Sequence, residues 1–170
     1  MSDAALLGVA RDFVFRGQTY KVSFRDIFTE LAFADWVGAE AGLFLGRMRA
    51  RWPAVIYQEQ AKILNGKVAS KGFSWGADDV HLAYWSDAGR RQMLFLKMQR
   101  GAEMEGGEPL TRDLIDDIAK DAPKWQELVD ILWQQDEPDF FADLLKERTM
   151  TAAPPSANPS SVPSASTPKA

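Results

Sequence analysis

Hydrophobic and polar residues alternate over residues 12–24, on both sides of Gly17. Phe13 and Phe15 share one side of the first segment, and Tyr20 and Val22 share one side of the second. Period-two alternation around a glycine-containing turn is typical of a β-hairpin. Because a lone hairpin is only marginally stable in water, we expect this one to pack on a helix or to pair with another chain.

From residue 25 to about residue 52 the hydrophobic pattern becomes helical. Glu30, Asp35 and Glu40 are spaced five residues apart, so they point in different directions around the axis and form no single polar face. A helix that is apolar on every side is buried or is in contact with another molecule.

Gly38, Gly42 and Gly46 recur every fourth residue of this helix and fall on nearly one side. Each glycine costs about 1 kcal/mol in a helix interior, so three in register predict a close approach of another backbone. That approach is either packing within the monomer or an interface between copies; a helix break at Gly38 or Gly42 is a further alternative.

The remainder of the chain shows helical periodicity interrupted by loop signals. We predict a loop with anchored aromatic residues at 67–77 and an exposed, glycine- and glutamate-rich loop at 101–109. The predicted helices are 53–65 (ended by Asn65-Gly66), 78–85, 86–100, 111–120, 121–135 and one that starts at 136–138. The strongest amphipathic signal lies in Trp125, Leu128, Val129, Leu132 and Trp133.

This pattern predicts a mainly α fold, with an N-terminal β-hairpin packed on a multi-helix bundle and a disordered Pro/Ser-rich C-terminal tail. We place an N-terminal arm at 1–10, a helical domain at 11–148 and the tail or linker at 149–170. About 150 residues are enough to bury a sizeable core.

Composition narrows the classes of function. The absence of cysteine excludes disulfides, thiolate metal sites and a cysteine nucleophile, and it fits a reducing compartment. The net charge of −4 is uneven: residues 61–100 hold 7 basic and 3 acidic side chains, whereas residues 101–150 hold 5 basic and 14 acidic ones. Such polarity steers protein partners and argues against nucleic acid as the main ligand.

We expect a cytoplasmic protein. The start of the chain, with a short apolar run from Ala4 to Ala10, lacks the basic start and the length of a secretory signal. No apolar run reaches the roughly 18 residues of a membrane span, so we predict no membrane partner.

Catalytic and metal-binding patterns are sparse. The single histidine, His81, lies three residues after Asp78, and Asp113, Asp117 and Asp121 would line one helix face. Neither group has a second set of ligands or an activated nucleophile that would complete a site, so we expect no enzyme, no metal and no cofactor. Arg90-Arg91 is either a solvated pair or a grip for an acidic partner.

Protein contact is therefore the expected activity, and aromatic residues dominate both interfaces and cores. The candidate contact residues are Phe28, Trp36, Gly38, Gly42, Phe44, Gly46, Trp75, Arg90, Arg91 and Trp133.

The layout resembles that of bacteriophage tail assembly chaperones. The first shared feature is a hairpin that leads into a long helix, around Phe15-Arg16-Gly17-Gln18-Thr19-Tyr20-Lys21-Val22. The second is the run before the apolar Met93–Met98 helix, Phe73-Ser74-Trp75-Gly76-Ala77-Asp78-Asp79-Val80. The third is an acidic helical part before a Pro/Ser-rich tail. It spans about residues 10–150 and is a similarity of layout more than of motif.

The resemblance implies a helper protein that coats the tape measure protein during tail assembly and is absent from the finished virion. It further implies a longer form, made by programmed frameshifting, that recruits tail tube subunits. Thr167-Pro168-Lys169 is compatible with a slippery codon sequence, as is Ala122-Pro123-Lys124. The alternatives are a virion structural protein, such as a tail completion or baseplate component, and a general cytoplasmic helical adaptor.

Overall fold

The structure is a computed structural model that describes residues 10–151. Within this range seven helices follow one two-stranded antiparallel sheet, which confirms the predicted fold class. The N-terminal arm up to residue 9, the tail from residue 152 and Thr167–Lys169 lie outside the described residues. The elements are β1 (Arg11–Phe15), β2 (Gln18–Val22), α2 (Ile27–Met48), α3 (Ala54–Ala69), α4 (Asp78–Trp85), α5 (Asp87–Met104), α6 (Arg112–Lys120), α7 (Ala122–Asp136) and α8 (Pro138–Thr151).

The predicted hairpin is present and its turn consists of Arg16 and Gly17. Both have positive φ angles, 50° and 78°, as a two-residue turn between twisted strands requires. The register places Phe13 opposite Tyr20 and Phe15 opposite Gln18. Phe13, Phe15 and Val22 are buried, so the apolar face of the hairpin covers the helices, as expected.

Helix α5 supports the hairpin directly. Gly101 lies beneath β2, where a Cβ atom would come within 2.2 Å of the Lys21 carbonyl oxygen. The Ser23 backbone N–H also donates to the Lys97 carbonyl oxygen at 3.1 Å. Contact this close explains why a glycine stands in the middle of an interface between helix and sheet.

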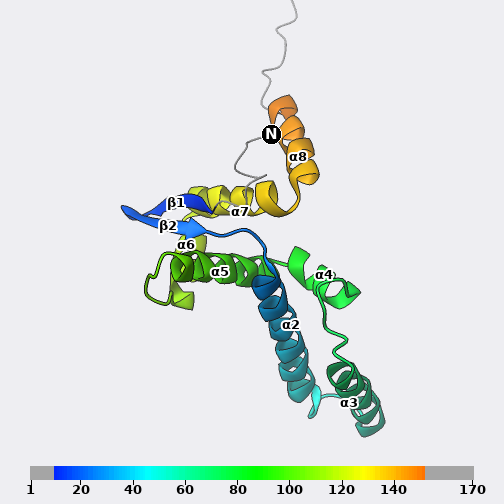
Figure 1. Ribbon diagram of the computed structural model, residues 1–170. Coiled ribbons are helices and arrows are strands. Elements are labelled where there is room, and N and C mark those ends of the chain that lie inside the picture. Colours follow the sequence, from blue (N-terminus) through cyan, green and yellow to red (C-terminus); the bar gives the residue numbers. More distant parts are fainter. Residues whose placement is uncertain (1–9, 152–170) are drawn as a thin grey trace, which may run out of the picture.

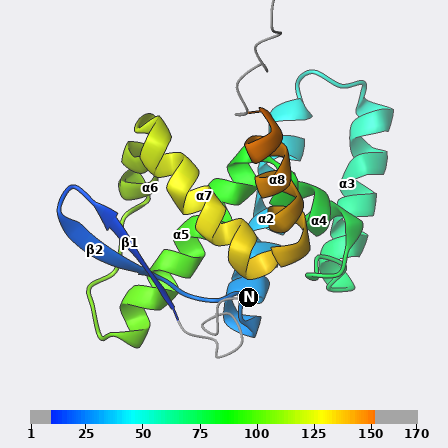
Figure 2. The same cartoon turned by 90° about the horizontal axis from the view of Figure 1, so that it is seen from above.

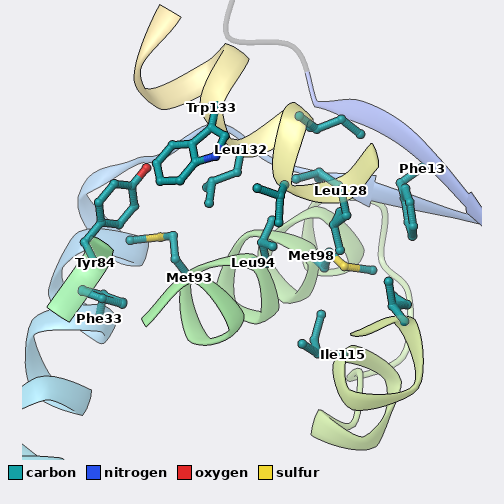
Figure 3. Packing of buried hydrophobic residues seen from close by; sticks show 14 of the residues in the cluster. Phe13, Phe33, Tyr84, Met93, Leu94, Met98, Ile115, Leu128, Leu132 and Trp133 are labelled. Atoms are coloured by element: carbon teal, nitrogen blue, oxygen red, sulfur yellow. The ribbon is translucent and has the colours of Figure 1, made fainter. Parts of the chain in front are cut away.

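The core lies between α5, α7 and the hairpin, and α4, α6 and the first half of α2 close its ends (Figure 3). Tyr84, Met93, Leu94, Leu128 and Leu132 are fully or almost fully buried there. Aromatic rings from three helices meet at one end, where Trp85 and Trp133 stack with their centroids 4.8 Å apart. These elements form the body of the protein.

Helices α2 and α3 extend away from this body as a helical hairpin, which we call the arm (Figures 1 and 2). The first half of α2 joins the core through Phe33, Ala34 and Val37, whereas α3 buries none of its residues. The arm therefore folds back on itself with little support from the body.

Three predicted helix ends are wrong. The helix predicted to about residue 52 ends at Met48. The other two ends are wrong for the same physical reason. Helix α3 does not stop at Asn65-Gly66 but continues to Ala69, and α5 does not stop near residue 100 but continues to Met104. Each ends in a paired C-terminal hydrogen-bond motif around a left-handed residue, Lys71 in one case and Gly106 in the other. Neither Gly66 nor Gly101, the glycine nearest to each predicted end, ends its helix.

Other boundaries follow the prediction more closely. Ser86 caps α5 by accepting from the Gly89 N–H, and Asp121 caps α7 by accepting from the Lys124 N–H. Helix α4 begins at Asp78, as predicted, and its N-cap residue is Ala77. Helix α8 runs to Thr151, past the boundary predicted at residue 148.

Candidate protein-binding surface

The arm carries most of the exposed apolar surface. Nine of the fourteen large hydrophobic side chains that are exposed among the described residues belong to α2 and α3. A concentration of exposed apolar side chains on one part of a protein is typical of a site of interaction. The nine residues are Ile27, Phe28, Leu31, Leu43, Phe44, Val55, Ile56, Ile63 and Val68.

The start of α2 is rigidly fixed, which positions this surface relative to the body. Asp26 and Thr29 form a capping box: the Asp26 carboxylate accepts from the Thr29 N–H at 2.8 Å, and the Thr29 hydroxyl oxygen accepts from the Asp26 N–H at 2.9 Å. Arg100 of α5 also donates to Asp26 at 3.1 Å. The cap therefore ties the base of the arm to the central helix.

A groove of about 760 Å³ runs along the base of the arm, between α2 and the segment that follows α3. We call it the arm groove. Its apolar lining includes Ile27 and Leu31 of α2, Val68 of α3, and Phe73 and Trp75 of the following loop. Leu31 and Val68 are each 57% exposed, so the groove has accessible apolar walls.

The loop wall of the arm groove is held by aromatic contacts. The Phe73 ring covers Gly38, where a Cβ atom would lie 3.3 Å from the ring. Trp75 packs edge-on against Phe33 with centroids 5.8 Å apart, and the Arg25 guanidinium lies 4.6 Å from the Trp75 ring centre. The prediction of a loop with an anchored aromatic pair is confirmed for residues 70–77, whereas 67–69 belong to α3. The anchored rings form one wall of the groove.

The glycine series has a mixed outcome. Gly38 meets Phe73 within the monomer, but no heavy atom lies within 4 Å of a Cβ placed at Gly42 or Gly46. Packing within the monomer is therefore wrong for Gly42 and Gly46. The alternative of a break at Gly38 or Gly42 is also wrong, because α2 runs unbroken through both. Both glycines lie on exposed helix surface.

The aromatic contact candidates divide between surface and core. Phe28 and Phe44 are exposed on α2, with Phe44 resting edge-on against Trp52. Trp36 is half-buried against the body and lines a smaller pocket beside α5 and α6. Trp133 is only 4% exposed and lies in the core, so the prediction of a contact role is wrong for it.

Arg90 and Arg91 are both engaged within the body. Arg90 pairs with Asp87 at 3.6 Å, and Arg91 pairs with Asp87 at 3.0 Å and with Asp116 at 3.4 Å. Arg91 also lies 5.5 Å from the ring centre of Trp125. Arg91 therefore links α5 to α6 and α7, whereas the Arg90 pair lies within α5, and neither residue lines the arm groove.

The residues with potential catalytic chemistry do not converge. His81 accepts a hydrogen bond from the Trp85 indole N–H at 3.0 Å, Asp117 pairs with Arg16 and Lys120, and Asp121 caps α7. Across residues 10–151 no three His, Asp or Glu side chains gather closely enough to bind a metal ion.

One buried polar cluster was not foreseen. The Lys97 ammonium lies 2.5 Å from an Asp136 carboxylate oxygen, and the Tyr84 hydroxyl donates to the other oxygen at 3.2 Å. Burial lowers the pKa of Lys97 despite the attraction of Asp136, and burial also raises the pKa of Tyr84. The only sequence signal was that Lys97 falls within the apolar run Met93–Met98.

None of the helices within residues 10–151 combines the length and apolar character of a bilayer-spanning segment. Comparison with known proteins gives no further guide to the arm groove, since no protein family, no curated protein and no solved structure matches this chain.

Proposed function

We propose that this protein is a non-catalytic assembly factor that holds an apolar segment of a client protein in the arm groove. In view of the layout shared with phage tail assembly chaperones, we propose the tape measure protein as that client during tail morphogenesis. Tail tube subunits would be recruited by a longer frameshifted form.

The observation that supports this proposal is the concentration of exposed apolar side chains on the arm, which the rest of residues 10–151 leaves uncovered. Helix α3 buries no residue, and Ile27 of α2 is 58% exposed. Removing each such side chain from water stabilises a complex by about 1.5–3 kcal/mol when burial is complete. A partner that covers several of them gains enough to offset the entropy of association.

The shape of the arm groove favours an amphipathic helix as the bound segment. The walls are a face of α2 on one side and the Phe73–Trp75 loop on the other, so the groove lies alongside a helix. Helices dock in such troughs by inserting apolar residues at a spacing of three and four. Asp35 and Lys71 at the edges supply charges that set the orientation of the segment.

Binding of the tape measure protein from the same genome tests this function. Leu31→Glu and Val68→Glu place a charge on each wall of the groove, while both side chains are exposed enough for the fold to persist. Leu82→Glu is the matched control, because Leu82 is 70% exposed on α4 and does not line the groove. We expect each groove variant to weaken binding at least about tenfold by isothermal titration, and the control to bind normally.

Two results would contradict the proposal. One is full affinity for the client in both groove variants. The other is an equal loss of affinity in the Leu82 control, which would indicate nonspecific hydrophobic binding. Presence of the protein in purified particles would instead favour the virion structural alternative. Intact mass spectrometry of products from the native coding sequence tests separately for the longer form.

A further inference from the structure

The arm groove begins close to the open end of the β-hairpin. Strand β2 ends at Val22, and α2 begins five residues later at Ile27, which lines the groove and is 58% exposed (Figure 1). Five residues of chain span at most about 18 Å. The first residue of β1, Arg11, lies opposite Val22. The chain that precedes β1 is therefore attached beside the groove.

The register of the hairpin indicates how the residues before β1 continue. Pairs in an antiparallel ladder alternate between those that exchange backbone hydrogen bonds and those that do not. Counted from the turn, Arg11 and Val22 form a pair of the bonded kind, so the next bonded pair is Val9 with Phe24. Within residues 10–151 the Phe24 backbone N–H donates to no other backbone group. A partner for this group is therefore available in the residues before β1.

The same residues are apolar. Residues 4–10 contain no charged or polar side chain and include Leu6 and Leu7. Three further residues of the same register bring Leu6 beside Ile27. The two residues before Leu6 span about 7 Å when extended, which is slightly more than one turn of α2 and reaches Leu31. An apolar segment thus has the length and the starting point to cover the apolar groove wall.

We infer that residues 4–9 of this chain occupy the arm groove when no client is bound. Leu6 and Leu7 then cover Ile27 and Leu31, the latter 57% exposed in the absence of this segment. Attachment through β1 gives the segment a high effective concentration at the groove, so a modest apolar gain is sufficient. The segment competes with the client for one site, and in this respect the inference rests on the proposed function.

The C-terminal tail is a poorer occupant. Residues 152–170 hold five prolines and a single large apolar side chain, Val162, so they have little to place against apolar walls. The tail also starts from α8, which Figure 1 shows at the opposite end of the molecule from α3. The segment before β1 is the better match in both composition and position.

Cysteine crosslinking of the full chain without client is the first test, because the chain has no cysteine of its own. Ala4→Cys/Leu31→Cys should form an intramolecular disulfide on mild oxidation at low protein concentration. Ala4→Cys/Leu43→Cys is the matched control, because Leu43 is also exposed on α2 but lies about 18 Å farther along the helix and does not line the groove. We expect the groove pair to form its disulfide at least about tenfold faster than the control pair. Equal rates in the two pairs, or no disulfide in either, would overturn the inference.

Titration with the tape measure protein separates this inference from the proposed function. Leu6→Ser/Leu7→Ser removes the apolar side chains of the competing segment and leaves the groove walls unchanged, so we expect the client to bind about three- to tenfold more tightly. Leu145→Ser, an equivalent change at an exposed position on α8, should leave client affinity unchanged. The same client affinity in wild type and in the Leu6/Leu7 variant would overturn the inference. Absence of client binding in both, with the groove disulfide still formed, would refute the proposed function and support the internal contact.

Discussion

The buried pair of Lys97 and Asp136 provides a quantitative test of the core. The Lys97 side chain is fully buried, the Asp136 side chain is 1% exposed, and their charged atoms are 2.5 Å apart. Lys97→Met keeps the length and apolar stem of the side chain but removes the ammonium. Asp136 then keeps only the Tyr84 hydroxyl as partner, and breaking a buried pair in this way costs about 3–5 kcal/mol.

The double variant Lys97→Met/Asp136→Asn should behave differently. It removes both charges, and the side-chain amide carbonyl that it introduces at position 136 can still accept from Tyr84. Burial lowers the pKa of Lys97 even beside its carboxylate, so desolvation outweighs attraction for the ammonium. We therefore expect the double variant to lie within about 1–2 kcal/mol of the wild-type free energy of unfolding.

Urea unfolding followed by tryptophan fluorescence measures the stability of the wild type, the two single variants Lys97→Met and Asp136→Asn, and the double variant. Trp133 reports on unfolding because it lies in the same core. Equal slopes with urea concentration would show that the midpoints report stability. A loss below about 1 kcal/mol in Lys97→Met would refute the reasoning, since the carboxylate would then tolerate burial alone. A double variant as unstable as the summed single variants would also refute it.

Three further predictions concern the close contact of helix and sheet, the cap of α2 and the buried tyrosine. Gly101→Ala should lower the free energy of unfolding by about 3 kcal/mol, because the added Cβ meets the Lys21 carbonyl oxygen. Gly66→Ala, in open space on α3, should raise it by up to about 1 kcal/mol. Urea unfolding of both variants tests this pair of predictions. Burial of Asp26 would raise its pKa, but hydrogen bonds from Thr29 and Arg100 outweigh burial and lower the pKa. The stability that Asp26 confers is therefore present above pH 3.8 and is lost as the pH falls through its folded pKa. The acid transition of Asp26→Asn should be shallower, and an unchanged slope of stability against pH would contradict this. Because burial raises the pKa of Tyr84, wild-type stability should fall above pH 10.0. Tyr84→Phe should reduce that fall and should cost about 1 kcal/mol of stability at neutral pH. The same dependence of stability on alkaline pH in wild type and variant would refute this prediction.

Local periodicity was sufficient to predict much of the fold. The hairpin follows from alternation around Gly17, and α7 follows from the apolar spacing that begins at Trp125. Helix ends were less predictable, because Gly66 and Gly101 are tolerated inside helices for reasons of exposure and packing. Whether a glycine ends a helix depends on the hydrogen bonds that the next residues make, and residue types alone do not predict these bonds.

The binding surface was only partly predictable. The all-round apolar character of α2 indicated contact with another molecule, and Phe28 and Phe44 are indeed exposed. The pairing of α2 with the Phe73–Trp75 loop brings together segments more than thirty residues apart, so spacing alone could not predict the groove. Trp133 shows the converse: an aromatic residue at helical spacing fits a core and an interface equally well until its neighbours are known.

Hydrogen exchange of the full chain, alone and with the tape measure protein, is the most direct test of client binding by the arm. We expect the client to slow backbone exchange over residues 27–48 and 54–75, which make up the arm and the loop wall of the arm groove. The hairpin at 11–22 and helices α6 and α7 should be unchanged. Protection confined to the hairpin or to α6 and α7, with none in the arm, would contradict the assignment of the arm as the binding surface.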